Sequence, residues 1–150
     1  MPTVKEVLND TKKRLKEQGI DTFSLDSSLL VSEVTGLTKI QLVTHDRDEV
    51  TEEQLDRLEN LVEERLKNKP MQYILGHCEF MGLDFKVTEN TLIPRGDTEN
   101  IVEEVIATIE NSGYNTVLDM CTGTGAIAIS VAHYTKAKVT ASDISKKALE

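Results

Sequence analysis

The stretch that most constrains the fold is "TVLDMCTGTGAIAIS", residues 116–130, in which an apolar run, a glycine-containing turn and a helix-like run follow one another. Residues 116–120 are β-branched and apolar and predict a strand, whereas residues 125–135 predict a helix. Residues 137–143 predict a second strand, and residues 145–150 begin another helix. This β-α-β-α order is typical of the opening of a parallel sheet, so we expect an α/β fold.

The turn after the first of these strands has the features of a nucleotide-type binding site. Backbone N–H groups at the start of a helix lack partners, and Gly123 and Gly125 have no side chain to keep a ligand away. Asp143 ends the next predicted strand, where a carboxylate can accept both hydroxyls of a ribose. Asp119 stands at the end of the first strand. Two carboxylates at one sheet edge need polar partners, which a ligand with hydroxyls and an amine provides.

The glycine spacing alone leaves the ligand open. The dinucleotide fingerprint G-x-G-x-x-G is matched only in a variant form, with Gly123, Gly125 and Ala128 at its three glycine sites. NAD and S-adenosyl-L-methionine both contain a ribose, so both fit an acid at position 143. In a third interpretation, the glycines serve the tight packing of the turn and bind nothing.

Residues 1–75 have the pattern of a helical bundle. Apolar residues recur at three- and four-residue spacing, glycines mark helix ends, and two Thr-x-x-Gln segments have capping-box spacing. Proline forbids continuation of the last helix. The first expected helix runs from Val4 to Gly19, and the second is capped by Ser24 and ended by Gly36. A third begins with the Thr38–Gln41 pair, and a fourth begins with the Thr51–Gln54 pair and stops before Pro70.

The pattern changes near Gly76. The segment "CEFMGLDFKV", residues 78–87, alternates apolar residues around Gly82 and predicts a β-hairpin. After "TLIPRGDTEN", residues 91–100, Asp97 or Thr98 can cap a helix that Gly113 ends. The expected parts are therefore a helical domain at 1–75, a hairpin linker at 76–94, and the first part of a ligand-binding domain at 95–150.

Charge and cysteine content exclude several classes of protein. The chain has 17 Lys and Arg against 26 Asp and Glu, and this net charge of −9 opposes attraction to nucleic acid phosphates. The two cysteines have no C-x-x-C spacing and the three histidines are isolated, so we expect no metal site. No apolar block is long enough for export or for crossing a membrane, so we expect a soluble cytoplasmic protein without a membrane partner.

Five segments, taken together, resemble the protein-(glutamine-N5) methyltransferases of the HemK/PrmC family, which modify peptide chain release factors. In chain order they are "PMQYILG", "FMGLDFKV", "LIPRGDTE", "VLDMCTGTGAIAIS" and "VTASDIS", so the resemblance covers essentially the whole chain. It implies a methyl transfer from S-adenosyl-L-methionine to a glutamine side chain in the glutamine-bearing loop of class 1 release factors. It also implies a class I, Rossmann-like methyltransferase domain, preceded by a helical domain that docks the substrate.

The resemblance assigns roles to individual residues. Gly123, Thr124 and Gly125 would cradle the methionine part of the cofactor, Asp143 would hold the ribose, and Asp119 would orient the turn and the amine. Arg95 would lie beside the pocket and shape the glutamine entrance, or else be purely structural. The expected cofactor-binding set is Asp119, Thr122, Gly123, Thr124, Gly125 and Asp143.

The sequence departs from the family pattern in places. Gly96 stands where Pro is usual, Met81 where Tyr is frequent, and Cys121 where Gly is common, which removes one glycine from the cradle. The family's Asn-Pro-Pro-Tyr loop, which holds the glutamine amide, is missing, because the only prolines are at positions 2, 70 and 94. We therefore expect a truncated sheet that carries the cofactor half-site and no catalytic residue, is inactive alone, and self-associates through its uncovered face.

Two other functions remain open at this level. The helical region could be a protein-binding docking module that uses the acidic helix at 51–67, although such charged faces are usually only solvated. The glycine turn could instead belong to an NAD-type oxidoreductase. Binding of NADH without binding of S-adenosylhomocysteine would favour the oxidoreductase.

Overall fold

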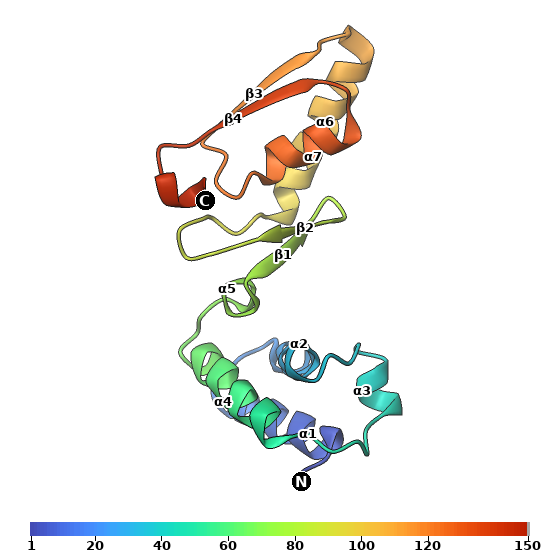
Figure 1. Ribbon diagram of the computed structural model, residues 1–150, viewed down its shortest axis with the longest axis vertical. Helices are drawn as coiled ribbons and strands as arrows, with labels where there is room; N and C mark the ends of the chain where they lie inside the picture. The colour runs from blue at the N-terminus through green and yellow to red at the C-terminus, as the bar shows by residue number, and fades with distance from the viewer. Residues whose placement is uncertain (150) are drawn as a thin grey trace. The chain divides into compact units, whose positions relative to one another are not determined.

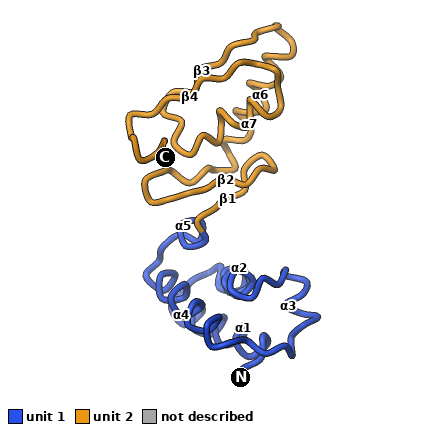
Figure 2. The backbone as a smooth tube through the Cα atoms, viewed as in Figure 1, with its two compact units in different colours: residues 1–75 blue, residues 76–150 orange. Residues whose placement is uncertain are grey.

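The computed structural model describes residues 1–149, which fall into two compact units that meet at Leu75 and Gly76 (Figure 2). The first unit is helical, with α1 Val4–Glu17, α2 Phe23–Thr35, α3 Gln41–Thr44, α4 Glu52–Leu66 and α5 Met71–Leu75 (Figure 1). The second unit contains β1 His77–Phe80, β2 Leu83–Lys86, α6 Gly96–Ser112, β3 Thr116–Met120, α7 Ala126–Tyr134, β4 Lys138–Ser142 and a 3-10 turn, η1, at Lys146–Ala148. This order of elements confirms the predicted α/β class, with a helical bundle first, then a hairpin and the start of a parallel sheet.

A capping box begins α4, as the spacing of Thr51 and Gln54 predicts. The Thr51 hydroxyl accepts the Gln54 N–H at 3.2 Å, and the Gln54 side chain accepts the Thr51 N–H at 2.9 Å. Thr38 and Gln41 form the same reciprocal pair, at 3.3 and 2.9 Å. The helix α3, however, begins only at Gln41, after the N-cap Ile40, and runs for four residues. The Thr38–Gln41 spacing therefore predicts the reciprocal bonds but neither the start nor the length of this helix.

Two predicted N-caps are wrong. Ser24 lies inside α2, which begins one residue earlier, and Thr22 precedes the helix with its hydroxyl donated to Asp26 at 2.8 Å. Asp97 and Thr98 lie inside the first turn of α6, whose N-cap is the extended residue Arg95. An acid is favoured at the N-cap by hydrogen bonding and in the first turn by the helix dipole, so the sequence pattern does not tell the N-cap from a first-turn position.

Pro70 lies between two helices. The expectation that α4 does not continue past it is correct, since α4 already ends at Leu66, and the short helix α5 begins directly after it. The Pro70 carbonyl accepts the N–H groups of Tyr73 and Ile74 at 3.1 and 3.2 Å. Proline is tolerated in the first turn of a helix, where its missing N–H has no intrahelical acceptor.

The long helices α1, α2 and α4 pack on one another around the core of the first unit (Figure 1). A buried ion pair joins two of them, because Arg65 of α4 donates from Nε to Asp26 of α2 at 2.8 Å. Arg65 also donates from Nη1 to the Lys69 carbonyl at 3.0 Å. The buried apolar residues of this unit are Val4, Val7, Leu15, Ile20, Leu30, Val31, Val34, Leu42, Val50, Leu58, Val62 and Met71.

The predicted hairpin is present, and its tip is held from two sides. Strands β1 and β2 pair antiparallel, with Phe80 opposite Leu83, and the two turn residues Met81 and Gly82 have φ of 52° and 71°. Two positive φ values define the type I′ turn that suits a tight hairpin. The Met81 N–H donates to the Glu99 carboxylate at 2.7 Å, and its carbonyl accepts the Tyr134 hydroxyl at 2.7 Å. The turn is therefore bonded to both α6 and α7.

The sheet of the second unit is parallel, as the β-α-β order predicts. Strand β3 pairs with β4 from Thr116 opposite Lys138 to Met120 opposite Ser142, and α7 connects them. Helix α7 packs against both strands and against α6 (Figure 1). The expected helix after β4 is a single turn, η1, within the described residues, and Glu150 lies outside them. The buried apolar cluster of this unit consists of Phe80, Phe85, Val102, Ala126 and Val131.

Candidate functional site

The turn between β3 and α7 is built from left-handed backbone. Cys121, Gly123 and Gly125 have φ of 63°, 56° and 78°. A side chain at Gly125 would place its Cβ 3.0 Å from Ile129 Cδ1, so packing as well as backbone conformation requires glycine there. Gly123 has open space where a Cβ would be, so a ligand can approach its backbone closely. The turn therefore leaves the backbone at Gly123 accessible beyond the end of a parallel strand.

The parallel register brings Asp143 to this turn. Met120 and Ser142 are opposite each other at the ends of the strands, and the Thr122 N–H donates to the Ser142 carbonyl at 2.9 Å. The Asp143 carboxylate accepts the Gly123 N–H on Oδ2 at 2.9 Å and the Ser145 N–H on Oδ1 at 2.8 Å. Those two hydrogen bonds, the one from Ser145 first, hold the pKa of Asp143 below its ordinary value. The acid thus stays ionised at neutral pH and points at the glycine turn.

Asp119 ties the end of β3 to the turn and to α7. Its Oδ2 accepts the Thr122 hydroxyl at 2.6 Å and the Ala128 N–H at 3.2 Å. The second of these bonds satisfies an amide in the first turn of α7, where no intrahelical acceptor exists. Among residues 1–149, no hydrogen bond is made to Oδ1 of Asp119. One oxygen of this half-buried carboxylate is therefore available to a ligand.

A cavity of about 140 Å³ lies against the turn. Thr122, Gly123 and Thr124 line it together with Arg95, while Asp119, Gly125 and Asp143 do not line it. Sites that enclose a whole small ligand measure about 300–1,000 Å³. The cavity is therefore too small to enclose a whole ligand of that size. Its other lining residues are Phe80, Leu92, Ile93, Pro94, Thr98, Cys121, Ala126 and Ile127.

A larger cavity of about 690 Å³ lies between β2, residues 88–91, α7 and η1. Of the expected site residues, only Thr124 reaches it. Asp84, Lys86, His133 and Lys147 also line it, and the Asp84 carboxylate is already bonded to His77 Nδ1 at 2.8 Å. The glycine turn, with its two acids, is therefore the better defined candidate site.

The sequence analysis missed the residues that hold the hairpin tip. Glu99 lies in the motif "LIPRGDTE", and its carboxylate caps the Met81 N–H, while Tyr134 at the end of α7 bonds the Met81 carbonyl. The motif itself is the only signal in the sequence for the role of Glu99. Nothing in the sequence near Tyr134 indicates its partner, which lies 53 residues away.

Two negative findings apply to the described part of the chain. Residues 1–149 contain no group of three or more His, Cys, Asp or Glu side chains arranged to hold a metal ion. No helix within these residues has the length and apolar character needed to cross a membrane. The thiols of Cys78 and Cys121 are both free.

The second unit is thus a nucleotide-type α/β domain of the Rossmann-like class, defined by a parallel strand, a glycine turn, a helix and a second strand that ends in an acid. Comparison with known proteins refines this class. A family model described as the PrmC N-terminal domain matches residues 6–76. The chain matches the amino-terminal portion of the family of release factor glutamine methyltransferases, as its motifs predict.

Three relatives illustrate the match, and each is named as a release factor glutamine methyltransferase. The one from Clostridium acetobutylicum is 42% identical over 147 residues, which cover 97% of this chain and 52% of the relative. The one from Moorella thermoacetica is 38% identical over 148 residues, or 98% of this chain and 52% of the relative. The one from Fusobacterium nucleatum subsp. nucleatum is 39% identical over 147 residues, or 97% and 42%. The chain spans about half the length of the curated relatives it matches.

Proposed function

We propose that the enzyme to which this chain belongs methylates N5 of a glutamine side chain in class 1 peptide chain release factors, with S-adenosyl-L-methionine as the methyl donor. The names of the relatives support the reaction and the substrate. The observation that carries the cofactor assignment is the hydrogen bond from the Gly123 amide to Asp143, which joins the glycine turn to the acid of the neighbouring strand. In this proposal, residues 1–75 dock the release factor and the enzyme works in the cytoplasm.

The donor atoms at the turn fit the chemistry of this cofactor. A carboxylate offers about four acceptor positions, and Asp143 uses one on each oxygen for a backbone N–H, which leaves positions for two ribose hydroxyls. The open Oδ1 of Asp119 suits the positively charged amine. Gly123 lets the ligand approach the backbone, and Thr122 and Thr124 line the adjoining cavity. The bound cofactor supplies an electrophilic methyl group on a sulfonium.

The glutamine must be held in place, because an amide nitrogen has its lone pair delocalised into the carbonyl and is a poor nucleophile. Fixed hydrogen-bond acceptors can bind the two amide hydrogens and set the nitrogen in line for attack. The sequence contains no Asn-Pro-Pro-Tyr segment for this task. Arg95, which lines the cavity at the turn, would shape the entrance for the glutamine. We therefore propose that residues 1–150 bind the cofactor and do not transfer the methyl group alone.

Calorimetric titration of the chain with S-adenosylhomocysteine tests the proposal. The unaltered chain should bind it, and Asp143→Asn should weaken binding about tenfold, which corresponds to about 1.4 kcal/mol. Asp97→Asn is the matched control, because it removes the same charge from an exposed position in α6. If NADH binds and S-adenosylhomocysteine does not, the turn belongs to an oxidoreductase and the proposed function is wrong.

A further inference from the structure

A groove of about 460 Å³ lies between α1 and α4 in the first unit. Val7, Leu55 and Leu58 give it an apolar floor. Val7 and Leu58 belong to the core, whereas Leu55 is only partly buried. The groove is bordered by four carboxylates, those of Glu6, Asp10, Asp56 and Glu59.

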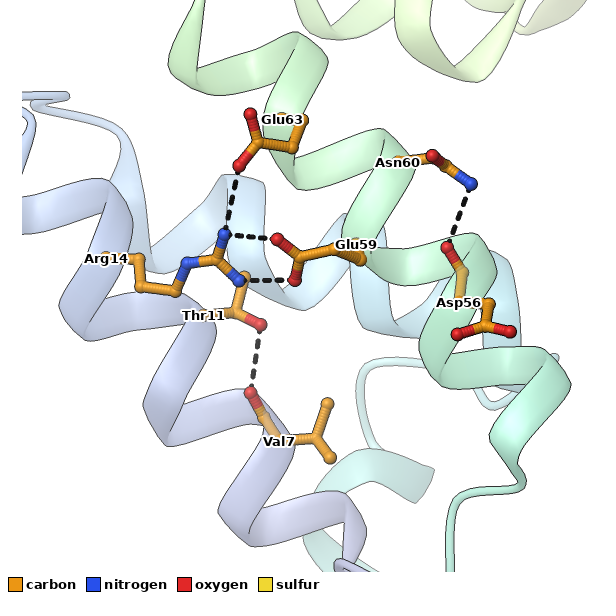
Figure 3. Close-up of polar contacts among 7 residues, drawn as sticks. All are labelled: Val7, Thr11, Arg14, Asp56, Glu59, Asn60 and Glu63. Atoms are coloured by element: carbon orange, nitrogen blue, oxygen red, sulfur yellow. Dashed lines mark hydrogen bonds and ion pairs between the residues drawn. The ribbon is translucent and has the colours of Figure 1, made fainter.

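The one cation that lines this groove is already neutralised (Figure 3). Arg14 donates from Nη1 and Nη2 to the two carboxylate oxygens of Glu59, both at 2.6 Å, and from Nη2 to Glu63 at 3.4 Å. The Thr11 hydroxyl donates to the Val7 carbonyl at 2.9 Å. Arg14 therefore leaves no positive charge for an acidic ligand.

Two of the carboxylates are available. Figure 3 shows the Asp56 side chain without a contact, while its carbonyl accepts the Asn60 amide at 3.0 Å. Within residues 1–149, Asp10 and Asp56 make no side-chain hydrogen bond and no ion pair. Glu6, by contrast, is occupied in the capping box of α1, where it accepts the Thr3 N–H at 2.8 Å. The groove thus combines an apolar floor with two carboxylates that form no hydrogen bond or ion pair within residues 1–149.

We propose that this groove docks a lysine- or arginine-bearing segment of a protein partner. The aliphatic stem of a long basic side chain packs along an apolar surface while its charged end stays at the polar rim. Here the stem would lie on Val7, Leu55 and Leu58, and the charged end would reach Asp10 and Asp56. An ion pair in a partly desolvated groove is stronger than one in open solvent.

Charge selects this occupant over the alternatives. A purely apolar ligand would cover the two carboxylates without giving them partners, which is unfavourable. A second copy of the chain carries a net charge of −9 and is repelled by an acidic groove. The inference rests on the proposed function, because the release factor is the partner that the reaction requires. It adds to that function the surface that is used and the side chain that is recognised.

The test is the affinity of the full chain for a purified class 1 release factor, measured by fluorescence anisotropy at low and high ionic strength. The double variant Asp10→Asn with Asp56→Asn should raise the Kd about tenfold, which corresponds to about 1.4 kcal/mol for the two ion pairs. It should also reduce the dependence of the Kd on salt. Both aspartates are exposed, so asparagine of the same size should leave the fold intact.

The control variant, Asp21→Asn with Glu53→Gln, removes the same two charges from exposed positions outside the groove. Its Kd should stay within about twofold of that of the unaltered chain. If the Asp10→Asn, Asp56→Asn variant and the control bind with equal affinity, the proposal that the groove docks the partner is wrong, and the proposed function is unaffected. If the release factor does not bind the chain at all, the docking proposal is also wrong. Titration with S-adenosylhomocysteine, which probes the other unit, then decides separately whether the proposed function holds.

Discussion

Removing the carboxylate of Asp26 should destabilise the helical unit more than any exposed ion pair could. Asp26 is 3% exposed and accepts hydrogen bonds from Thr22 Oγ1 and Arg65 Nε, both at 2.8 Å. The Arg65 side chain is itself only 15% exposed. In Asp26→Ala, the guanidinium would keep its bond to the Lys69 carbonyl and lose its counter-charge.

The size of the effect follows from this burial. Removing one partner of a buried pair costs about 3–5 kcal/mol, because the remaining charge is left without compensation. The exposed pair of Arg14 and Glu59, whose carboxylate side chain is 55% exposed, is worth about 0–1 kcal/mol despite its short contacts. Asp26→Ala combined with Arg65→Met should recover most of the loss, since no buried charge then remains.

Urea denaturation followed by circular dichroism at the helix band measures the change, since most helices lie in the first unit. The midpoint should fall strongly in Asp26→Ala, slightly in Glu59→Ala, and by an intermediate amount in the double variant, with the slope unchanged. A loss below about 1 kcal/mol in Asp26→Ala would refute the reasoning, because that is the range of a solvated pair. So would a double variant that is less stable than Asp26→Ala.

Four further predictions concern the second unit. Cys121→Gly should stabilise the chain by about 0.5–1 kcal/mol in urea denaturation, because relief of left-handed strain outweighs the added chain entropy, and a loss of stability would contradict this. Glu99→Gln should cost about 1 kcal/mol, since a neutral acceptor replaces a charged one at the Met81 N–H, and amide hydrogen exchange at Met81 should quicken. The pKa of Asp143 is lower in the folded state than in the unfolded state. Its ionised carboxylate therefore stabilises the fold fully above the unfolded pKa of about 3.9, and this contribution is lost as the pH falls through the folded pKa. Affinity for S-adenosylhomocysteine should therefore be constant from about pH 5 to 8 and fall only in stronger acid, and loss of binding near neutrality would rule out control by this acid. The exposed apolar strand residue Leu118, 60% accessible, should cause residues 1–150 to self-associate in light scattering, and Leu118→Lys should reduce this, whereas a monomeric unaltered chain would disprove it.

Local signals in the sequence predicted most of the elements. Gly36 and Gly113 end α2 and α6 in the left-handed conformation, which glycine adopts most readily. The turn at Met81 and Gly82 follows from the alternation of apolar residues around it. Such signals act over a few residues and do not depend on tertiary structure.

The errors arose where two local patterns compete. Ser24 has a side chain suited to an N-cap but lies inside α2, and the hydroxyl of Thr22, which precedes the helix, donates to Asp26 and caps no backbone N–H. The buried partner of Asp26, Arg65, is 39 residues away, and spacing cannot reveal such a pair.

For the candidate site, the sequence predicted the turn and the approach of Asp143 to it, because the ends of neighbouring parallel strands meet at one edge. It did not predict that the acid bonds the Gly123 amide, which depends on the exact backbone path. The binding roles of the six cofactor residues remain predictions. So does the role of Arg95.

The bridge from Asp143 to Gly123 and Ser145 has a consequence for the energetics of recognition. It joins the segment after β3 to the segment after β4 through hydrogen bonds within the protein, and these bonds orient the two backbone amides. Loops that must be immobilised on association lose conformational entropy, and this loss is subtracted from the affinity. Because these two hydrogen bonds already hold the turn, part of this loss is avoided, and binding of the proposed cofactor should require little rearrangement of the backbone.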